Sequence, residues 1–573
     1  MLENPVMEER RQDRLGRFCL PGSDISMMRI TEGMLLLGAF LLSVLLLCFG
    51  NSAVFPLGVV DFVFFSALAF FCSLYRPGWA FLLFISLLPF EMIDLSSDIL
   101  PLSIRPYQLL GSILILSIVI RFVTHRLPFL LMRFRWFDVL PIVFGVGGLL
   151  SIGFAPDGAG AAKQSVVALS FVALYFLSRQ FLGEVRDVRR VMPFLLLASA
   201  STALFSLWQS MRFTEGLVSF EVMPGRPNAF FSEPDWLGMF CIAAGSMALA
   251  LLFYVLHERS VEGDLPKHAS GEQRPYSRQL ASFLCRYSNG LLLLSCFLFL
   301  TLSLLGLLLT VARSAWAGFA FSLPLFLLLL LWARAWHPRF WYWKRLLKGV
   351  LLVVSSGVAA IFVIAGFHLT TFDLTDRAGS AASGQQRITV SCDTPTVLPE
   401  SIADISELSS YGCRFIRLEA IDAEQAAGKF IGTVSRPDPS IEARRVISRT
   451  IFETLRSHWL FGIGWGSIGN ILGTDDRGAS LNASNAFLEA WLGGGLISGL
   501  SFLVLWILIP IFALRTFFAR GGELERVTLR SVAVFFLVSW IGFTVFNVFN
   551  SGVLLGFVWV WLGGIGIIAG RGK

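Results

Sequence analysis

Residues 290–333 have the sequence GLLLLSCFLFLTLSLLGLLLTVARSAWAGFAFSLPLFLLLLLWA. Arg313 is the one charged residue in this stretch, and it separates two apolar runs, 290–312 and 314–333. A helix that crosses a bilayer needs about 20 predominantly apolar residues, so each run is long enough to span the membrane once. The stretch therefore predicts a pair of transmembrane helices with an arginine in the turn between them.

The composition of the whole chain agrees with this prediction. Hydrophobic residues make up 55% of the 573 residues and charged residues only 15%, whereas soluble domains have roughly 25% charged residues. The 54 Phe and 16 Trp exclude a disordered chain, and eight Cys are too few for a disulfide scaffold. The sequence thus predicts an all-α polytopic membrane protein.

Hydrophobic segments of suitable length recur along the chain. Two of them are weak candidates, 53–75 because it contains Asp61 and 78–93 because it is short, so we expect about 12–14 transmembrane helices. The fourteen candidates are 34–50, 53–75, 78–93, 105–121, 137–154, 163–182, 191–210, 236–256, 290–312, 314–333, 349–366, 485–514, 531–549 and 553–570.

Lysine and arginine gather in every second connection between these candidates. The basic segments are 121–135, 179–190, 259–286, 334–348, 515–530 and 571–573. The positive-inside rule places that side, and both termini, in the cytoplasm. Residues 1–33 lack a cleavage site after a short apolar run and are predicted to be a cytoplasmic segment rather than a signal peptide. The net charge of +7 then reflects membrane orientation, and no nucleic-acid partner is expected.

Four regions follow from this topology. Residues 1–33 are the cytoplasmic segment, 34–366 a transmembrane bundle of about 11 spans, 367–484 an extracytoplasmic loop domain, and 485–573 a bundle of about three spans. Within the loop domain, 377–386 is rich in Ser, Ala and Gly and is expected to be a flexible loop. Residues 440–459 show helical periodicity and predict an amphipathic helix.

Basic residues on the outer side are few and therefore informative. Arg313 at a membrane boundary predicts a functional group, although an arginine that snorkels to lipid headgroups is the alternative. For Arg226, in the sequence PGRPN, a structural salt bridge in a loop is as good an explanation as function. No HExxH, CxxC or Walker motif occurs, and only six His are present, so neither a metal site nor a cofactor is expected.

Cys392 and Cys413 are the two cysteines in outer loops. An oxidising compartment favours a disulfide between them, worth about 3 kcal/mol by chain entropy for a loop of this length. The alternative is two free thiols.

Four blocks in order resemble the O-antigen ligase and O-antigen polymerase superfamily of bacterial inner-membrane glycosyltransferases. They are GRPNAFFSEPDWLG at 225–238, LTVARSAWAG at 309–318, the segment from Arg444 to HWLFGIGWG at 458–466, and SNAFLE at 484–489 with the glycine-rich stretch to Gly499. The resemblance covers roughly residues 140–570. It implies transfer of a glycan from a polyprenyl-diphosphate carrier, at the outer face of the inner membrane, to a glycan or lipid acceptor.

Arginine suits such a donor because its planar fork binds phosphate through two hydrogen bonds and keeps its charge. Arg226, Arg313 and Arg444, with Arg445 as the adjacent alternative on its helix, are the predicted diphosphate ligands, and Asn485 is a predicted substrate-binding residue of the fourth block. These cations can stabilise the leaving diphosphate without a metal.

The acceptor hydroxyl needs a general base, for which Glu233, Asp235 and His458 are the candidates. Ligases of this superfamily typically have a His just before the Asn of the fourth block, whereas this chain has Ser484. We therefore favour a polymerase that lengthens a carrier-linked glycan, with a ligase as the alternative. A polytopic transporter remains the alternative from another class, although no pair of interrupted helices in corresponding halves supports it.

Overall fold

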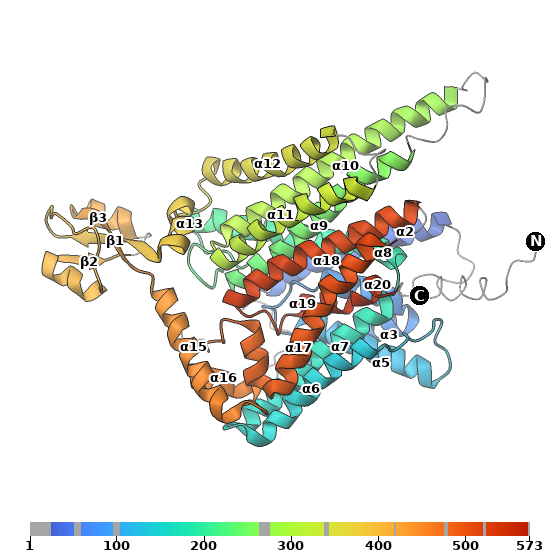
Figure 1. The fold of residues 1–573 in the computed structure, drawn as a ribbon, viewed down its shortest axis with the longest axis horizontal. Helices are drawn as coiled ribbons and strands as arrows, with labels where there is room; N and C mark the ends of the chain where they lie inside the picture. The colour runs from blue at the N-terminus through green and yellow to red at the C-terminus, as the bar shows by residue number, and fades with distance from the viewer. Residues whose placement is uncertain are drawn as a thin grey trace, which may run out of the picture.

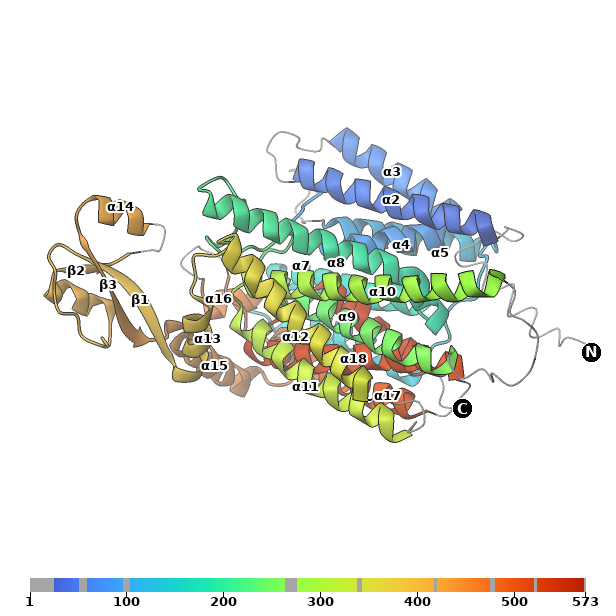
Figure 2. The ribbon, with the colours of Figure 1, turned by 90° about the horizontal axis from the view of Figure 1, so that it is seen from above.

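The computed structural model describes residues 25–50, 59–95, 104–262, 276–336, 343–416, 420–474, 480–519 and 523–570. Long helices lie side by side in a bundle, and a small three-stranded sheet projects from one end of it (Figures 1 and 2). Most of the predicted cytoplasmic segment 1–33 lies outside the described residues.

Ten helices of the described chain are long and apolar enough to cross a membrane, and they correspond to ten of the fourteen predicted spans. They lie in α5 (Pro106–Val123), α6 (Val139–Ser151, extended by the 3-10 turns Trp136–Asp138 and Ile152–Phe154), α7 (Gly158–Phe181), α8 (Val185–Thr214), α9 (Pro234–Glu262), α10 (Tyr276–Leu309), α11 (Arg313–Trp336), α12 (Trp343–Gly366), α17 (Ala486–Phe518) and α18 (Glu523–Phe549). The prediction of a polytopic helical membrane protein is confirmed.

The other four predicted spans are shorter apolar helices. They are the Glu32–Val44 part of α2 (Ile25–Gly50), α3 (Val59–Tyr75), α4 (Pro77–Ser86) and the Gly556–Ile568 segment, which contains α19 (Gly556–Gly563) and α20 (Ile565–Ile568). Although α4 has only 10 residues, most of its side chains are buried, so it packs inside the protein.

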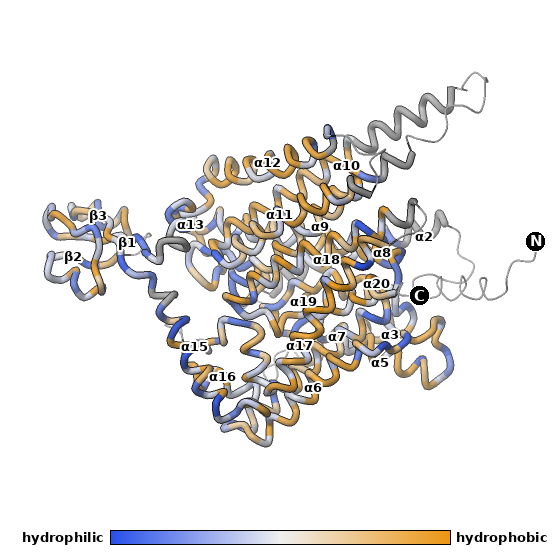
Figure 3. Tube along the Cα trace, in the orientation of Figure 1, coloured by the Kyte–Doolittle hydropathy of each residue, from blue (hydrophilic) through white to orange (hydrophobic). Residues whose placement is uncertain are grey.

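The core of the bundle forms around α17 and α18. α17 packs along α6, and α18 packs against α9, α11 and α17. Figure 3 shows hydrophobic residues along these helices, hydrophilic residues mainly at the ends of the bundle, and a mixture of both in the projecting part. Local signals set the helix starts: Pro106 occupies the first turn of α5, and the side chain of Asn485 caps α17 by accepting hydrogen bonds from the backbone N–H groups of Phe487 and Leu488.

The projecting part contains residues 385–437, which we call the sheet insert. Its strands β1 (Gln385–Cys392), β2 (Cys413–Phe415) and β3 (Phe430–Pro437) form an antiparallel sheet in the order β2-β1-β3, and α14 (Ile421–Ala426) lies between β2 and β3 in the chain. Ile388, Val390 and Val434 belong to its own small hydrophobic core.

Two helices connect the sheet insert to the bundle (Figure 1). α15 (Pro439–His458) confirms the predicted amphipathic helix at 440–459. The prediction of a flexible loop at 377–386 is wrong, because residues Leu374–Ser383 form α13 and Gln385 begins β1. Asp373 explains the helix, since its carboxylate accepts hydrogen bonds from the backbone N–H groups of Thr375 and Asp376 at 2.8 and 3.1 Å. Further on, α16 (Ile468–Leu472) is a single short turn.

Candidate active site at the end of the helical bundle

Arg313 is held at the first position of α11 by a tight turn from α10. Val311 in this turn has a positive φ of 52°, and the hydroxyl of Thr310 accepts a hydrogen bond from the N–H of Ala312 at 3.3 Å. The Arg313 guanidinium forms an ion pair with Asp438, the residue just before α15. Both side chains are largely buried, with 15% and 3% exposed. The ion pair therefore fixes the start of α15 against the start of α11.

Arg226 lies beside this turn. Its Nε donates a hydrogen bond to the carbonyl of Thr310 at 2.9 Å, and its terminal nitrogen forms an ion pair with Asp235 at 2.8 Å. Gly225 has a φ of +72°, and a Cβ there would lie 3.1 Å from the ring of Phe372. The loop before α9 is thus packed closely between the α10–α11 turn and the segment that leads into α13.

Arg444 and Arg445 lie in the first half of α15, which begins at Pro439. The pKa of Arg444 is lowered, first by partial burial and then by the nearby positive charge of Arg313, while Asp235 and Asp438 oppose the shift. Arg445 is more exposed and has Glu442 at 3.5 Å. The two arginines therefore differ: Arg444 belongs to a group of interacting charges, and Arg445 stands at its edge.

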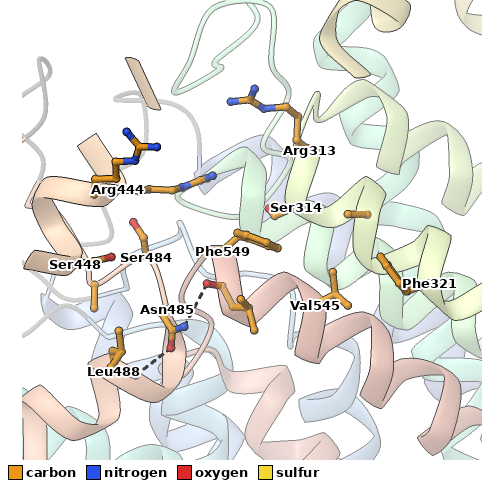
Figure 4. Close-up of a pocket in the computed structure, with 14 residues that line it drawn as sticks. Arg313, Ser314, Phe321, Arg444, Ser448, Ser484, Asn485, Leu488, Val545 and Phe549 are labelled. Atoms are coloured by element: carbon orange, nitrogen blue, oxygen red, sulfur yellow. Dashed lines mark hydrogen bonds between the residues drawn. The ribbon is translucent and has the colours of Figure 1, made fainter. Parts of the chain in front are cut away.

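A cavity of about 830 Å³ opens between these elements (Figure 4). One part of its wall is polar and carries four of the predicted binding residues. The polar wall contains Arg313, Ser314, Arg444, Arg445, Ser448, Ser484 and Asn485. The remaining wall is apolar and is formed by Ala317, Phe321, Ala483, Leu488, Val545, Val548 and Phe549. The cavity therefore suits a molecule with an anionic head and a hydrocarbon tail.

Asn485 lines this cavity, but its side chain makes structural hydrogen bonds to the backbone. Its Oδ1 accepts from the backbone N–H groups of Phe487 and Leu488, both at 3.0 Å, and its Nδ2 donates to the carbonyl of Val548 at 3.2 Å. Asn485 thus joins the start of α17 to the end of α18. The preceding Ser484 has a positive φ of 49° and also lines the cavity.

The three candidate bases lie in different places. Asp235, in the first turn of α9, is paired with Arg226 and close enough to Arg444 to affect its pKa. Glu233 lies just before α9, and its carbonyl accepts a hydrogen bond from the N–H of Leu237. His458 is the last residue of α15, about 21 Å along the helix from Arg444 at 1.5 Å per residue. Its Nδ1 lies 2.9 Å from the Ser457 hydroxyl, so His458 belongs to the helix end and not to the cavity.

The structure adds three charged residues that the sequence analysis did not select. Asp438 pairs with Arg313, and Arg377 of α13 lies among the same charges. Burial and the nearby Arg313 and Arg226 lower the pKa of Arg377 to about 10. Glu221 lies in the loop before α9, where burial raises its pKa to about 7, although its carboxylate accepts a hydrogen bond from the N–H of Gly225 at 2.9 Å. No local motif marks these residues, because their significance depends on contacts with distant segments.

The glycines of the third and fourth blocks serve packing. Gly462 has a φ of +70°, and a Cβ there would lie 2.3 Å from the carbonyl oxygen of Leu492. α17 is kinked at Gly494 and Gly495, and the N–H of Leu496 donates to the carbonyls of Trp459 and Leu460 at 3.1 Å. The segment after α15 is therefore hydrogen-bonded into the interruption of α17, which fixes the far end of α15.

In the sheet insert, Cys392 and Cys413 form a disulfide between β1 and β2, with their Cα atoms 4.1 Å apart. Within the described part of the chain, no group of three or more His, Cys, Asp or Glu side chains is placed to hold a metal ion.

The fold and the cavity define a multi-pass helical membrane protein with an arginine-rich site at one end. Residues 297–503 match the family model described as O-Antigen ligase (Wzy_C). The match includes the second, third and fourth blocks and confirms, for this part of the chain, the predicted resemblance to the O-antigen ligase and polymerase superfamily. The comparisons with curated proteins and with solved structures gave no match.

Proposed function

We propose that this protein transfers a glycan from a polyprenyl-diphosphate carrier to a second carrier-linked glycan, and so lengthens a surface polysaccharide such as an O-antigen or an exopolysaccharide. The observation that carries the proposal is the cavity with arginines on one wall and apolar side chains on the other. A polyprenyl diphosphate has the same division between a charged head and a hydrocarbon tail.

The apolar wall supports access from the bilayer. Phe321 of α11 is 60% exposed, and Val548 and Phe549 at the end of α18 are 44% and 46% exposed. These side chains belong to candidate membrane-spanning helices or their ends, so we infer that their exposed surface would face lipid. A carrier could therefore place its head near Arg313 and Arg444 while its tail stays in the hydrocarbon region.

The polar wall suits the chemistry of the leaving group. The acceptor hydroxyl oxygen forms the new bond to the anomeric carbon, the bond from that carbon to the diphosphate oxygen breaks with its electron pair, and the hydroxyl proton goes to a base. Arg313 and Arg444 of this wall, together with Arg226 beside the α10–α11 turn, would bind the diphosphate and stabilise the charge that it gains. No step in this scheme needs a metal ion.

Asp235 is our choice as the base. It is a quarter exposed, forms an ion pair with Arg226 and interacts electrostatically with Arg444. When the diphosphate takes over the guanidinium of Arg226, the Asp235 carboxylate becomes available to accept a proton. Glu233, two residues earlier, is the alternative. The position of His458 at the far end of α15, about 21 Å along the helix from Arg444, argues against that residue.

Ser484 is the residue on which our preference for a polymerase over a ligase depends. It occupies the place of the ligase histidine, and the cavity lining contains no His. A serine hydroxyl is a poor proton acceptor near neutral pH, which favours the polymerase. The second candidate is a ligase that transfers the glycan to lipid A core or another acceptor, and the description of the matching family model favours it.

The site is proposed to face the periplasm, with the chain in the bacterial inner membrane and both termini in the cytoplasm. The described basic connection 124–135 and the final helix α20 lie at the end of the bundle opposite to the sheet insert (Figure 1). Reporter fusions near Ser383 and near Arg278 should therefore give opposite sides of the membrane. The same side for both would refute this placement.

The decisive experiment is a deletion strain complemented with Arg226→Lys, Arg313→Lys or Arg444→Lys. Each change keeps the charge and removes the fork, so we expect single repeat units to accumulate on the carrier while the protein still inserts. Arg456→Lys on the exposed face of α15 is the matched control. Full complementation by all three variants would refute the proposed site, and long unattached chains in the deletion strain would favour the ligase.

A further inference from the structure

Six charged side chains interact electrostatically where the loop domain contacts the bundle, and we call them the cationic cluster. They come from five separate segments: the loop before α9, the starts of α9 and α11, α13, and the region around the start of α15. The members are Arg226, Asp235, Arg313, Arg377, Asp438 and Arg444. Four arginines and two aspartates leave an excess of two positive charges in the cluster.

Arg377 enters this cluster from the loop domain. α13 contacts α11, and the side chains of Thr371 and Phe372, just before α13, lie against Gly225. This packing holds α13 beside the loop that carries Arg226. Arg377 is partly buried there and interacts electrostatically with Arg313, Arg226, Asp438 and Asp235.

We propose that Arg377 is a further anion-binding residue, through which α13 completes the donor diphosphate site. The proposal rests on the proposed function and goes beyond it, because it assigns part of the donor site to a helix outside the membrane bundle. Each phosphate of the carrier-linked donor carries a negative charge, and breaking the glycosyl bond leaves a further negative charge on the terminal phosphate. Arg377 would stabilise this added charge on the released carrier.

The charge balance of the cationic cluster supports a ligand role for Arg377. Burial lowers the pKa of Arg377 most, the nearby cations Arg313 and Arg226 lower it further, and Asp438 and Asp235 oppose the shift. The four arginines of the cationic cluster outnumber its two aspartates, and this excess of positive charge attracts an anionic ligand.

Inorganic pyrophosphate is a suitable probe, since it carries the diphosphate head without a tail or a sugar. We would measure its affinity by calorimetry for the full-length protein in detergent, with Arg377→Gln, Arg377→Lys and Arg387→Gln. Arg387 belongs to the same domain, but it is exposed and paired with Asp376 at 3.4 Å, which makes it a matched control. We expect Arg377→Gln to weaken binding at least tenfold, Arg377→Lys to recover part of the loss, and Arg387→Gln to bind like wild type.

Steady-state kinetics with carrier-linked donor provide a second measurement. Arg377→Gln should lower kcat more than it raises KM if Arg377 acts mainly on the developing charge. Unchanged pyrophosphate binding and unchanged kcat in Arg377→Gln would overturn the inference, while a loss of both in Arg313→Gln would leave the proposed function intact. A wild-type protein that binds no pyrophosphate would refute both. A wild type that binds pyrophosphate through Arg377 but transfers no glycan would refute only the proposed function.

Discussion

Asp438→Asn is the sharpest test of how the site is assembled. The substitution keeps the size of the side chain and removes the charge that faces Arg313, and Asp438 is only 3% exposed. Removing one partner of a buried ion pair costs about 3–5 kcal/mol, because the other charge stays buried. Arg313 retains some exposure and the amide can still accept a hydrogen bond, so we expect a loss of about 2–3 kcal/mol in the free energy of unfolding.

The matched control is Asp393→Asn. Asp393 is 79% exposed and lies 3.4 Å from Lys429, and surface pairs of this kind contribute only about 0–1 kcal/mol. Thermal unfolding of the two purified variants in the same detergent gives the comparison of stability. Glycan transfer should fall strongly only in Asp438→Asn, because the ion pair that fixes the start of α15, and with it Arg444, against Arg313 is lost. If the two variants have the same melting temperature and the same kcat/KM, the ion pair neither stabilises the fold nor positions the site.

Three other changes test separate parts of the structure. Gly462→Ala should destabilise the protein by at least about 3 kcal/mol, because the new side chain combines a positive φ with a clash against backbone. Gly412→Ala, at a φ of +66° with open space around it, should cost only about 1–2 kcal/mol. Equal melting temperatures of the two variants would contradict this reasoning. Replacing Cys392 and Cys413 by Ser together should cost about 3 kcal/mol and speed proteolysis within the sheet insert, whereas cleavage at the wild-type rate would show that the disulfide is dispensable. Burial raises the pKa of Glu221 to about 7 from 4.5, so its contribution to stability is full below pH 4.5 and is lost as the pH rises through 7. Glu221→Gln should flatten the pH dependence of the melting temperature between these two values. An unchanged profile would refute the raised pKa of Glu221.

The transmembrane helices could be predicted from the sequence because hydropathy acts locally. A run such as 290–312 needs no distant partner to be recognised, and α15 was equally clear from its periodicity. α13 was missed for a related reason. Its Ser, Ala and Gly residues resemble a loop, and the cap at Asp373 shows its effect only when the backbone turns to meet it.

The candidate site divides in the same way. Arg313 stands out because placing a cation between two apolar membrane spans costs free energy, and Arg444 follows from the third family block and its predicted outer location. Asp438 could not be found so directly, since its partner Arg313 lies 125 residues away in the chain. The glycines of the third block, at 462–466, are conspicuous in the sequence but do not line the cavity. In the structure Gly462 packs on α17.

The two ends of the sheet insert lie next to each other. The chain enters it at Gln385 and leaves it at Pro437, which are paired across β1 and β3, and the N–H of Asp438 donates to the carbonyl of Gly384 at 2.9 Å. An inserted module with adjacent ends can be shortened, exchanged or replaced by a tight turn without changing the path of the chain on either side. Arg377, before the insert, and Asp438, directly after it, would keep their places. The sheet insert can therefore vary in length and sequence while the charged residues next to it keep their positions.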